Sequence, residues 1–172
     1  MGFNKVLLPL DGSELAELAI RRAIEVANAG ARIHLLSVVD PNCFDDMAVR
    51  ELAGLNTTDF DELDRLLEAA TEVSDREGAD VYLRQRYLMQ RAEQLIGQGF
   101  KATVKIVAGY AATSISAAAC DGFDVIVMAT HGRSGLTKVF LGSVTQEILH
   151  NLPCPILIVP ANIPQPSSRK HA

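Results

Sequence analysis

The clearest pattern in the chain is a series of short apolar runs separated by segments with helical spacing. Lys5–Leu10 and Ile33–Val39 are two such runs, typical of strands buried on both faces of a sheet. Between them, alanine and isoleucine recur at every third or fourth position from Ala16 onward. Ser13 is placed to cap this helix and Gly30 to end it. A strand, a helix and a strand joined by short turns predict a βαβ unit with parallel strands.

Three more apolar runs follow in the second half of the chain. Thr103–Ala108 alternates as a half-exposed strand does, whereas Asp124–Ala129 is apolar throughout after its first residue. Ile156–Val159 lies between two prolines, which cannot donate to a strand ladder, and this favours an edge strand.

Capping residues mark two helices between these strands. Thr113 or Ser114 is placed to cap an alanine-rich helix that runs through Cys120. Ser143 and Gln146 have the spacing of a capping box at the start of a later helix, which we expect to end near Asn151.

Strands that alternate with helices in this way predict an α/β fold, in which a doubly wound, five-stranded parallel sheet carries helices on both faces. Ligands of such sheets bind beyond the carboxyl ends of the strands, where the strand order reverses. This rule directs attention to Asp11, to residues 38–40 and to the loop that begins at Ala129.

The middle of the chain is harder to interpret. Residues 41–78 form an extra segment of loop or helix, and a helical pattern runs from Asp61 to Gln98. One helix of that length would extend ~55 Å, so we expect a break at Gly78. Residues 1–161 are predicted to form one domain, and residues 162–172, polar and rich in proline, a disordered tail.

Composition excludes several classes of function. The net charge is −5 and the lysines and arginines form no stripe, so we expect no binding to nucleic acid or anionic membranes. No apolar run reaches the ~18 residues of a membrane span, and the first residues do not resemble a signal peptide. The three cysteines, Cys43, Cys120 and Cys154, include no close pair. We expect two of them to be small buried residues, and the protein to be cytoplasmic.

The candidate chemistry lies in a glycine-rich loop after the fourth strand. Gly132 and Gly135 let the backbone approach a ligand closely, and Gly142 and Ser143 stand at the start of the next helix. Unpaired amides at a helix N-terminus attract anions, and the hydroxyls of Ser134 and Ser143 can also donate to phosphate. The pattern predicts a phosphate-binding loop that needs no basic side chain.

At this point the sequence resembles the universal stress protein family. Nucleotide-binding members carry a motif of Gly, two residues, Gly, nine residues, Gly and Ser or Thr. Gly132 matches the second glycine, and Arg133–Leu141 supplies nine residues before Gly142 and Ser143. The similarity extends to the segments around Lys5–Ser13 and Pro153–Val159.

The resemblance implies a Rossmann-like sheet in the order 3-2-1-4-5 and an adenine nucleotide as ligand: ATP, ADP or AMP, with Mg²⁺ or Mn²⁺ accompanying ATP. It implies that Asp11 lies near the ribose or the divalent ion. The nucleotide-binding residues that it implies are Pro9, Leu10, Asp11, Val38, Met128, Ala129, Gly132, Arg133, Ser134, Gly142, Ser143 and Val144. It also implies an antiparallel homodimer through Ile156–Val159, consistent with an apolar edge strand.

Some interpretations stay open. Ala129 replaces the first glycine of the motif, which costs ~1 kcal/mol or more if that position needs positive φ, and nothing if it merely ends a strand. Asp11 could contact ligand or only cap the first helix. His131 could be a general base, although a histidine in such a loop more often only hydrogen-bonds the loop. His34, inside a strand, is interpreted as structural.

Three functions are compatible with these patterns. The first is a nucleotide-binding regulatory or stress-response protein with little or no ATPase activity, because the chain lacks a Walker A lysine motif. The second is a member of the same family that binds no nucleotide and acts through dimerisation, an alternative kept open by Ala129. The third is an adenylylating enzyme, whose signature loops after the first strand are absent.

Overall fold

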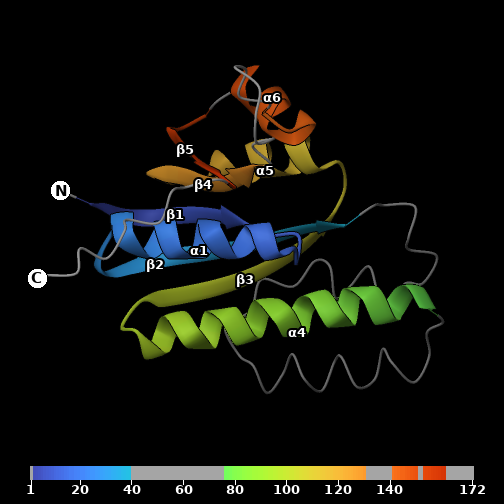
Figure 1. Ribbon diagram of the computed structural model, residues 1–172, viewed down its shortest axis with the longest axis horizontal. Coiled ribbons are helices and arrows are strands. Elements are labelled where there is room, and N and C mark those ends of the chain that lie inside the picture. Colours follow the sequence, from blue (N-terminus) through green and yellow to red (C-terminus); the bar gives the residue numbers. More distant parts are fainter. Residues whose placement is uncertain (1, 40–75, 131–140, 151–152, 162–172) are drawn as a thin grey trace, which may run out of the picture.

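The computed structural model describes residues 2–39, 76–130, 141–150 and 153–161, without the side chains of residues 76–82. Five parallel strands form one sheet in the order β3-β2-β1-β4-β5, which confirms the expected fold and strand order (Figure 1). The strands are β1 (Phe3–Pro9), β2 (Ala27–Val39), β3 (Lys101–Ala108), β4 (Val125–Thr130) and β5 (Ile156–Pro160).

Helices cover both faces of this sheet. Helices α1 (Glu14–Val26) and α4 (Arg76–Gly97) pack on one face, and α5 (Ala111–Ala119) and α6 (Ser143–His150) on the other. The chain adds strands outward from β1 in one direction and then returns to add β4 and β5 on its other side. Because parallel crossovers keep one hand, this reversal moves the helices to the opposite face.

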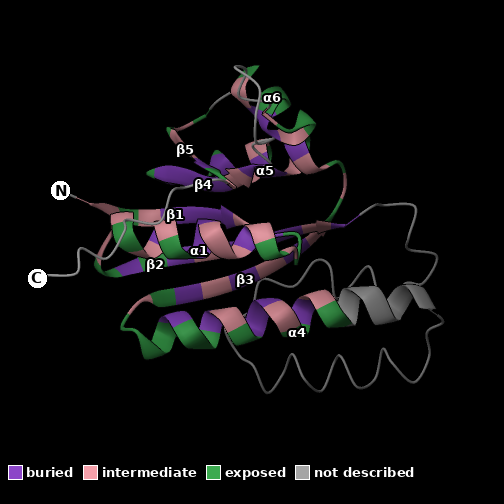
Figure 2. Ribbon diagram, in the orientation of Figure 1, coloured by how far each residue is buried: buried purple, intermediate pink, exposed green. Residues whose placement is uncertain are grey.

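The sheet separates two hydrophobic clusters (Figure 2). Neighbouring residues of β1 alternate between them, since Leu8 packs toward α1 and α4 whereas Leu7 packs toward α5 and α6. Both side chains are fully buried, as expected for a central strand read from a continuous apolar run. On α4, the core-facing residues include Leu88, Ala92 and Leu95, whereas Ile96, expected on the same apolar face, is 44% exposed.

The start of α1 follows the sequence prediction, but its end does not. The Ser13 Oγ accepts a hydrogen bond of 3.3 Å from the Ala16 amide, which confirms Ser13 as the N-cap. The helix stops at Val26 because Ala27 is already extended and begins β2, so the prediction that Gly30 ends the helix is wrong. Gly30 instead uses its positive φ of 72° inside β2, where the register with β1 shifts.

Helix α5 begins earlier than its polar residues suggested. Its N-cap is Tyr110, whose side chain makes no capping bond, and the Ser114 amide donates to the Tyr110 carbonyl in the first turn. The predicted caps Thr113 and Ser114 therefore lie inside the helix. Alanine has the highest helix propensity, so Ala111 and Ala112 can form the first turn themselves. The helix therefore begins before the first residue with a polar side chain.

Two further expectations are wrong. Helix α4 runs without a break from Arg76 to Gly97, so Gly78 lies in its first turn, where amides have no intrahelical partner and glycine disturbs no hydrogen bond. Cys120, at the end of α5, is exposed and Cys154 is only half-buried, so neither is the fully buried residue that was expected. The apolar runs beside the cysteines are buried, but the cysteines lie at the ends of elements.

Other expectations lie outside the described residues. These are the burial of Cys43, the loop or helix expected within residues 41–75, the end of the last helix near Asn151 and the disorder of residues 162–172. Among the helices of the described ranges, none combines the length and apolarity needed to cross a bilayer.

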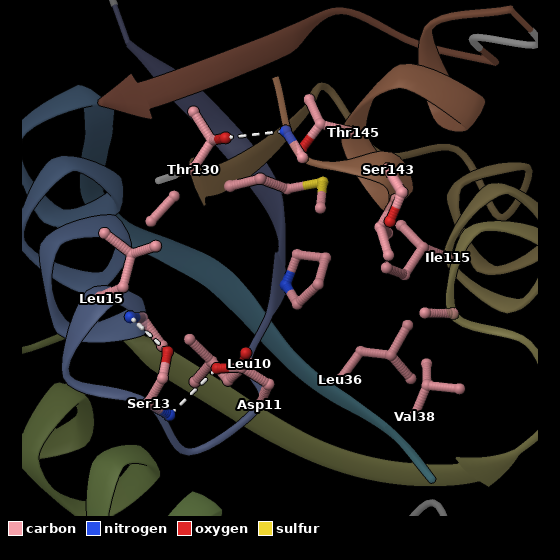
Figure 3. A pocket seen from close by; sticks show the side chains of 17 residues that line it. Leu10, Asp11, Ser13, Leu15, Leu36, Val38, Ile115, Thr130, Ser143 and Thr145 are labelled. Carbon is pink, nitrogen blue, oxygen red and sulfur yellow. Dashed lines mark hydrogen bonds between the residues drawn. The ribbon is translucent and has the colours of Figure 1, made fainter. Parts of the chain in front are cut away.

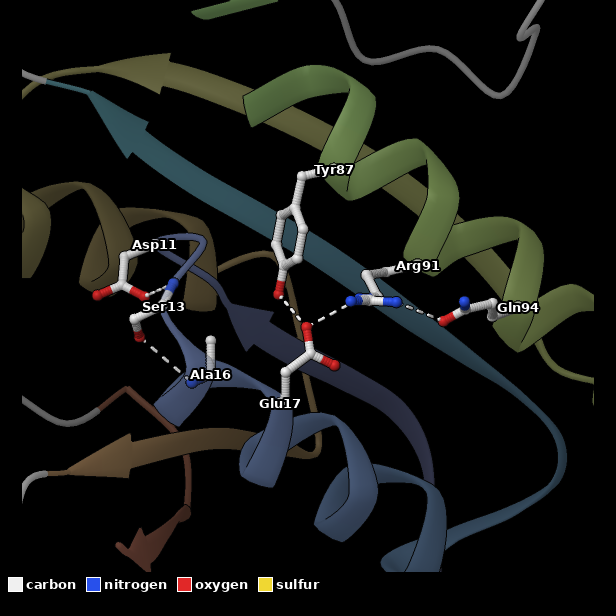
Figure 4. A network of polar contacts seen from close by, with 7 residues as sticks. All are labelled: Asp11, Ser13, Ala16, Glu17, Tyr87, Arg91 and Gln94. Carbon is white, nitrogen blue, oxygen red and sulfur yellow. Dashed lines mark hydrogen bonds and ion pairs between the residues drawn. The ribbon is translucent and has the colours of Figure 1, made fainter. Parts of the chain in front are cut away.

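A polar network joins the two helices of the first face (Figure 4). The Tyr87 hydroxyl and the Arg91 Nε of α4 both donate to the Glu17 Oε1 of α1, each at 2.8 Å. Arg91 also donates to Gln94 at 2.9 Å. Burial, then the Glu17 carboxylate, raises the pKa of Tyr87 to about 12, so its proton stays available for this bond. The network fixes α4 against α1 near the first turn of α1.

His34 in β2 is a structural histidine, as predicted. Its Nδ1 is hydrogen-bonded to the Thr103 Oγ1 of β3, and its ring lies 5.6 Å from that of Phe123. Burial, and then the charges of Lys105 and Lys5, lower the pKa of His34 to about 4. The ring is therefore neutral in the folded protein at neutral pH.

The protein should become less stable in mild acid because of His34. The folded pKa of about 4 lies below the unfolded value of 6.5, so the contribution is fully present above pH 6.5 and is lost as the pH falls toward 4. We expect the free energy of unfolding, measured by urea titration, to be roughly 2 kcal/mol lower at pH 5 than at pH 7. His34→Gln, which keeps a hydrogen-bonding group but does not titrate, should flatten this dependence. An equally steep dependence in both proteins would contradict the assignment.

Candidate functional site

The crevice begins where β1 and β4 separate. Their ladder contains two partner pairs, Val6 with Val125 and Leu7 with Ile126, although both strands continue further. Beyond Pro9 the chain stays with β2, because the Leu10 amide donates to the Leu36 carbonyl at 2.8 Å. β4 continues beside β5 to Thr130. The carboxyl ends of β1 and β4 therefore part at the point where the strand order reverses, as expected for a doubly wound sheet.

A cavity of about 230 Å³ occupies this place (Figure 3). Its walls come from the ends of β1, β2 and β4 and from the first turns of α1, α5 and α6. The lining residues are Pro9, Leu10, Asp11, Ser13, Leu15, Ala16, Leu36, Val38, Ala111, Ile115, Met128, Ala129, Thr130, Gly142, Ser143, Val144 and Thr145.

Most residues that the sequence pointed to lie in this wall. Those brought together are Pro9, Leu10, Asp11, Val38, Met128, Ala129, Gly142, Ser143 and Val144. Gly132, Arg133 and Ser134, like His131, lie outside the described residues. Sequence reasoning missed Leu36, which its spacing of two from Val38 would have placed on the same face of β2. It also missed Ile115, for which no local signal exists, because Ile115 reaches the cavity only when α5 packs on the face of the sheet that α6 also covers.

The cavity has an apolar part and a polar part. The apolar part belongs to the second hydrophobic cluster, which lies between the sheet and helices α5 and α6. Its residues are Leu36, Val38, Ile115 and Met128. Asp11 and Ser13 stand on the side of α1, whereas Thr130, Ser143 and Thr145 stand on the side of α6 (Figure 3). An apolar pocket bordered by a few polar groups suits a flat organic ring that carries polar substituents.

Ala129 has the conformation of an ordinary strand residue. It pairs with Val159 of β5, and no described residue other than glycine has positive φ. Its methyl group packs against the hydrophobic cluster between the sheet and helices α1 and α4, as does Val127, two positions earlier in β4. Of the two alternatives for the missing glycine, the structure therefore supports the second, in which the position ends a strand and a methyl group is tolerated.

Helix α6 begins at Ser143 and is preceded by a glycine N-cap rather than by a capping box. The Gly142 carbonyl accepts from the Gln146 amide at 2.9 Å, so Gly142 is the N-cap and Ser143 the first helical residue. The predicted capping role of Ser143 is wrong because the helix starts one residue earlier. The Gly142 amide donates to the Thr130 Oγ1 at 3.1 Å. Within the described ranges, the amides of Ser143 and Val144 have no acceptor, and the helix dipole favours an anion near them.

Asp11 has both of the roles considered for it. Its Oδ1 accepts from the Ser13 amide at 3.0 Å and so orders the turn before α1, while the carboxylate also borders the cavity. Burial alone would raise the pKa of Asp11, but hydrogen bonds from the Ser13 side chain and backbone and the charge of Arg84 outweigh it. The pKa lies below its usual value, so Asp11 is ionised at neutral pH.

The cavity wall contains few charges. Asp11 is the only charged side chain among the described lining residues. Nor do the described parts of the chain contain a group of three or more histidine, cysteine or acidic side chains that could hold a metal ion. Among the described residues, amides and hydroxyls are therefore the groups that could recognise an anionic ligand.

Comparison with known proteins agrees with this architecture. The model of the universal stress protein family matches residues 2–160. Universal stress protein MJ0577 from Methanocaldococcus jannaschii is 29% identical over 164 residues, covering 91% of this chain and 94% of its own. The solved structure of MJ0577 superposes with a TM-score of 0.64 and 25% identity, and covers 95% of this chain and 100% of that chain.

Two solved structures of more distant proteins share the fold and hold ligands. A universal stress protein in complex with cAMP is 18% identical, with a TM-score of 0.53, and covers 94% of this chain and 100% of its own. The universal stress protein from Archaeoglobus fulgidus in complex with dAMP is 13% identical, with a TM-score of 0.54, and covers 92% of this chain and 99% of its own.

The turn before α1 generates a prediction about Ser13. Ser13→Ala removes the N-cap and should lower the free energy of unfolding by about 1 kcal/mol. It should also raise the pKa of Asp11, because the side-chain hydrogen bond that stabilises the carboxylate is lost. Carboxyl carbon NMR titration measures the second effect, and Ser13→Thr, which keeps the hydroxyl, is the control. An unchanged Asp11 titration in Ser13→Ala would contradict the assignment.

Proposed function

The chain belongs to the universal stress protein family, and we propose that it binds an adenine nucleotide in the cavity between β1 and β4 as a regulatory, stress-response protein. The observation that carries this proposal is the position of the α6 amides and of Asp11 on opposite polar sides of one apolar cavity. The ligands of the two distant family members, cAMP and dAMP, are both adenine nucleotides.

The adenine would occupy the apolar part of the cavity. Leu36, Val38, Ile115 and Met128 provide apolar walls of the kind that flat heterocycles need. At about 230 Å³ the cavity is smaller than the ~300–1,000 Å³ usual for drug-sized ligands. It therefore suits a base with part of a ribose, and the phosphates would lie at its rim.

The phosphate would lie at the first turn of α6. The amides of Ser143 and Val144 and the hydroxyls of Ser143 and Thr145 are among the donors on that side. Backbone amides at a helix N-terminus bind phosphate without a lysine or arginine. Asp11, on the other polar side, has a carboxylate that can accept from ribose hydroxyls.

Asp11 also fits a divalent cation that arrives with ATP. It is ionised, and its Oδ1 accepts a hydrogen bond from the Ser13 amide. Mg²⁺ is commonly held by one or two carboxylates together with phosphate oxygens and water. Asp11 would supply one ligand of Mg²⁺ or Mn²⁺, and the cation would offset the repulsion between Asp11 and the phosphates.

We infer that ATP hydrolysis is slow or absent. Efficient phosphoryl transfer needs cationic groups at the phosphates, a metal site and a residue that orients the nucleophile. The described cavity wall supplies one carboxylate and several hydroxyls, which suit binding more than turnover. The protein would then act by changing state when the nucleotide binds.

A homodimer and a cytoplasmic location are further parts of the proposal. β5 is an edge strand, and its half-buried Ile158 belongs to neither core cluster of the described residues. An apolar side chain on an open edge favours pairing with a second copy. The free thiols of Cys120 and Cys154 are compatible with a reducing compartment.

Nucleotide binding can be tested with two neighbouring valines. Val38 and Val107 are partners in the β2–β3 ladder, both are half-buried, and only Val38 lines the cavity. Val38→Phe should fill the adenine site and weaken binding of AMP and of Mg²⁺-ATP roughly tenfold or more, whereas Val107→Phe should bind as the original protein does.

Calorimetric titration measures this difference, and thermal unfolding of both variants checks that they are folded. If the unaltered protein binds no adenine nucleotide at millimolar concentration, the proposed function is wrong. If Val38→Phe and Val107→Phe weaken binding equally, the ligand lies elsewhere.

The dimer gives a separate prediction. Light scattering after gel filtration should show twice the 18.6 kDa mass of one chain. Ile158→Lys should convert the protein to a monomer with little loss of stability, because a charge on the edge blocks pairing. Ile96→Lys places the same charge at a side chain of α4 that is 44% exposed and should leave the dimer intact. A monomeric parent protein at micromolar concentration would rule out the proposed dimer.

A further inference from the structure

Thr130 lies where β4 meets the cavity, and its backbone is held by β5. It pairs with Pro160, and its carbonyl accepts from the Ala161 amide at 3.0 Å. The residue is only 3% exposed and borders the cavity on the side of α6 (Figure 3). The sheet therefore holds the backbone of Thr130 in place.

The Thr130 side chain connects this rigid strand to the first turn of α6. Its Oγ1 accepts the 3.1 Å hydrogen bond from the amide of Gly142, twelve residues later. Gly142 is the N-cap, and its carbonyl accepts from the Gln146 amide at 2.9 Å. One hydroxyl thus links the sheet to the residue from which α6 starts.

The glycine itself does not explain this placement. Gly142 is not among the glycines with positive φ, and a Cβ built on it would lie 3.8 Å from the Thr130 Oγ1, an ordinary contact. Neither backbone strain nor lack of space therefore fixes residue 142 against β4. Among the described residues, the hydrogen bond that the Gly142 amide donates to the Thr130 Oγ1 is the contact that does so.

We propose that Thr130 is the positioning residue for the 5′-phosphate of the bound nucleotide, and that it acts through Gly142; this inference rests on the proposed function. By accepting the hydrogen bond from the Gly142 amide, the hydroxyl would hold the start of α6 so that Ser143 and Val144, which line the cavity, present their amides to the phosphate. The adenine and ribose contacts do not pass through this bond.

The proposal predicts different effects on the affinities for AMP and adenosine, two ligands that differ by one phosphate. Thr130→Val keeps the size of the side chain but removes the acceptor. Its affinity for AMP should fall by about tenfold, the effect of one positioned hydrogen bond, while its affinity for adenosine stays unchanged. Thr130→Ser should restore the AMP affinity. Thr113→Val, the same change at an exposed residue of α5, is the control and should alter neither affinity.

Calorimetric titrations with AMP and adenosine give the ratio of affinities for each variant. A merely structural role would lower the thermal midpoint and both affinities together. An unchanged ratio in Thr130→Val, or a serine variant that behaves like the valine variant, would overturn the inference. If the unaltered protein binds neither AMP nor adenosine, the proposed function fails instead.

A second measurement does not depend on the variants being folded. In the unaltered protein, NMR should show the Gly142 amide protected from hydrogen exchange, and the protection should persist when AMP saturates the site. A rapidly exchanging Gly142 amide, or protection that AMP abolishes, would overturn the inference.

Discussion

The structure depends on one constraint, the early separation of β1 from its neighbour β4. The two strands share only two partner pairs before β1 follows β2 and β4 follows β5. The described residues that line the cavity meet there because the ends of β1, β2 and β4 and the starts of three helices reach the same edge of the sheet. A longer ladder between β1 and β4 would close the space that a ligand needs.

The chemistry of the cavity follows from which groups reach that edge. Strand ends contribute apolar side chains continuous with the second hydrophobic cluster, and helix starts contribute amides and hydroxyls. Recognition of a phosphate by backbone amides requires that the helix be held in place, since amides cannot move independently as a lysine side chain can. The contacts around α1 and α6 meet this requirement. Ser13 and Asp11 order the turn before α1, and Thr130 anchors Gly142 at the start of α6.

The first face of the sheet is stabilised in a different way. There Tyr87 and Arg91 of α4 share the carboxylate of Glu17 on α1, above a core of alanine and leucine side chains (Figure 4). Small residues on α1 let it pack closely, and the shared carboxylate sets the relative position of the two helices. Since Asp11 and α4 also interact through the charge of Arg84, the pocket side of α1 is connected electrostatically to α4.

The sequence alone determined the fold class, the buried centre of each strand and part of the cavity wall, although β2 begins at Ala27 rather than at Ile33. Buried parallel strands appear as apolar runs such as Val125–Met128, and the switch-point rule then indicates the edge of the sheet at which the cavity lies. Ser13 was identified as a cap because its hydroxyl acts within one turn. Local patterns failed where the decisive contact was not local. Gly30 serves a register shift in β2 rather than the end of α1, and Gly142 rather than Ser143 caps α6.

Only the tertiary structure decided that Ala129 is an unstrained strand residue, because its conformation is set by pairing with Val159 of another strand. Only the tertiary structure brought Ile115 into the cavity and joined Thr130 to Gly142. These contacts link residues far apart in the chain, and a pattern of neighbouring residues carries no information about how distant segments come to touch.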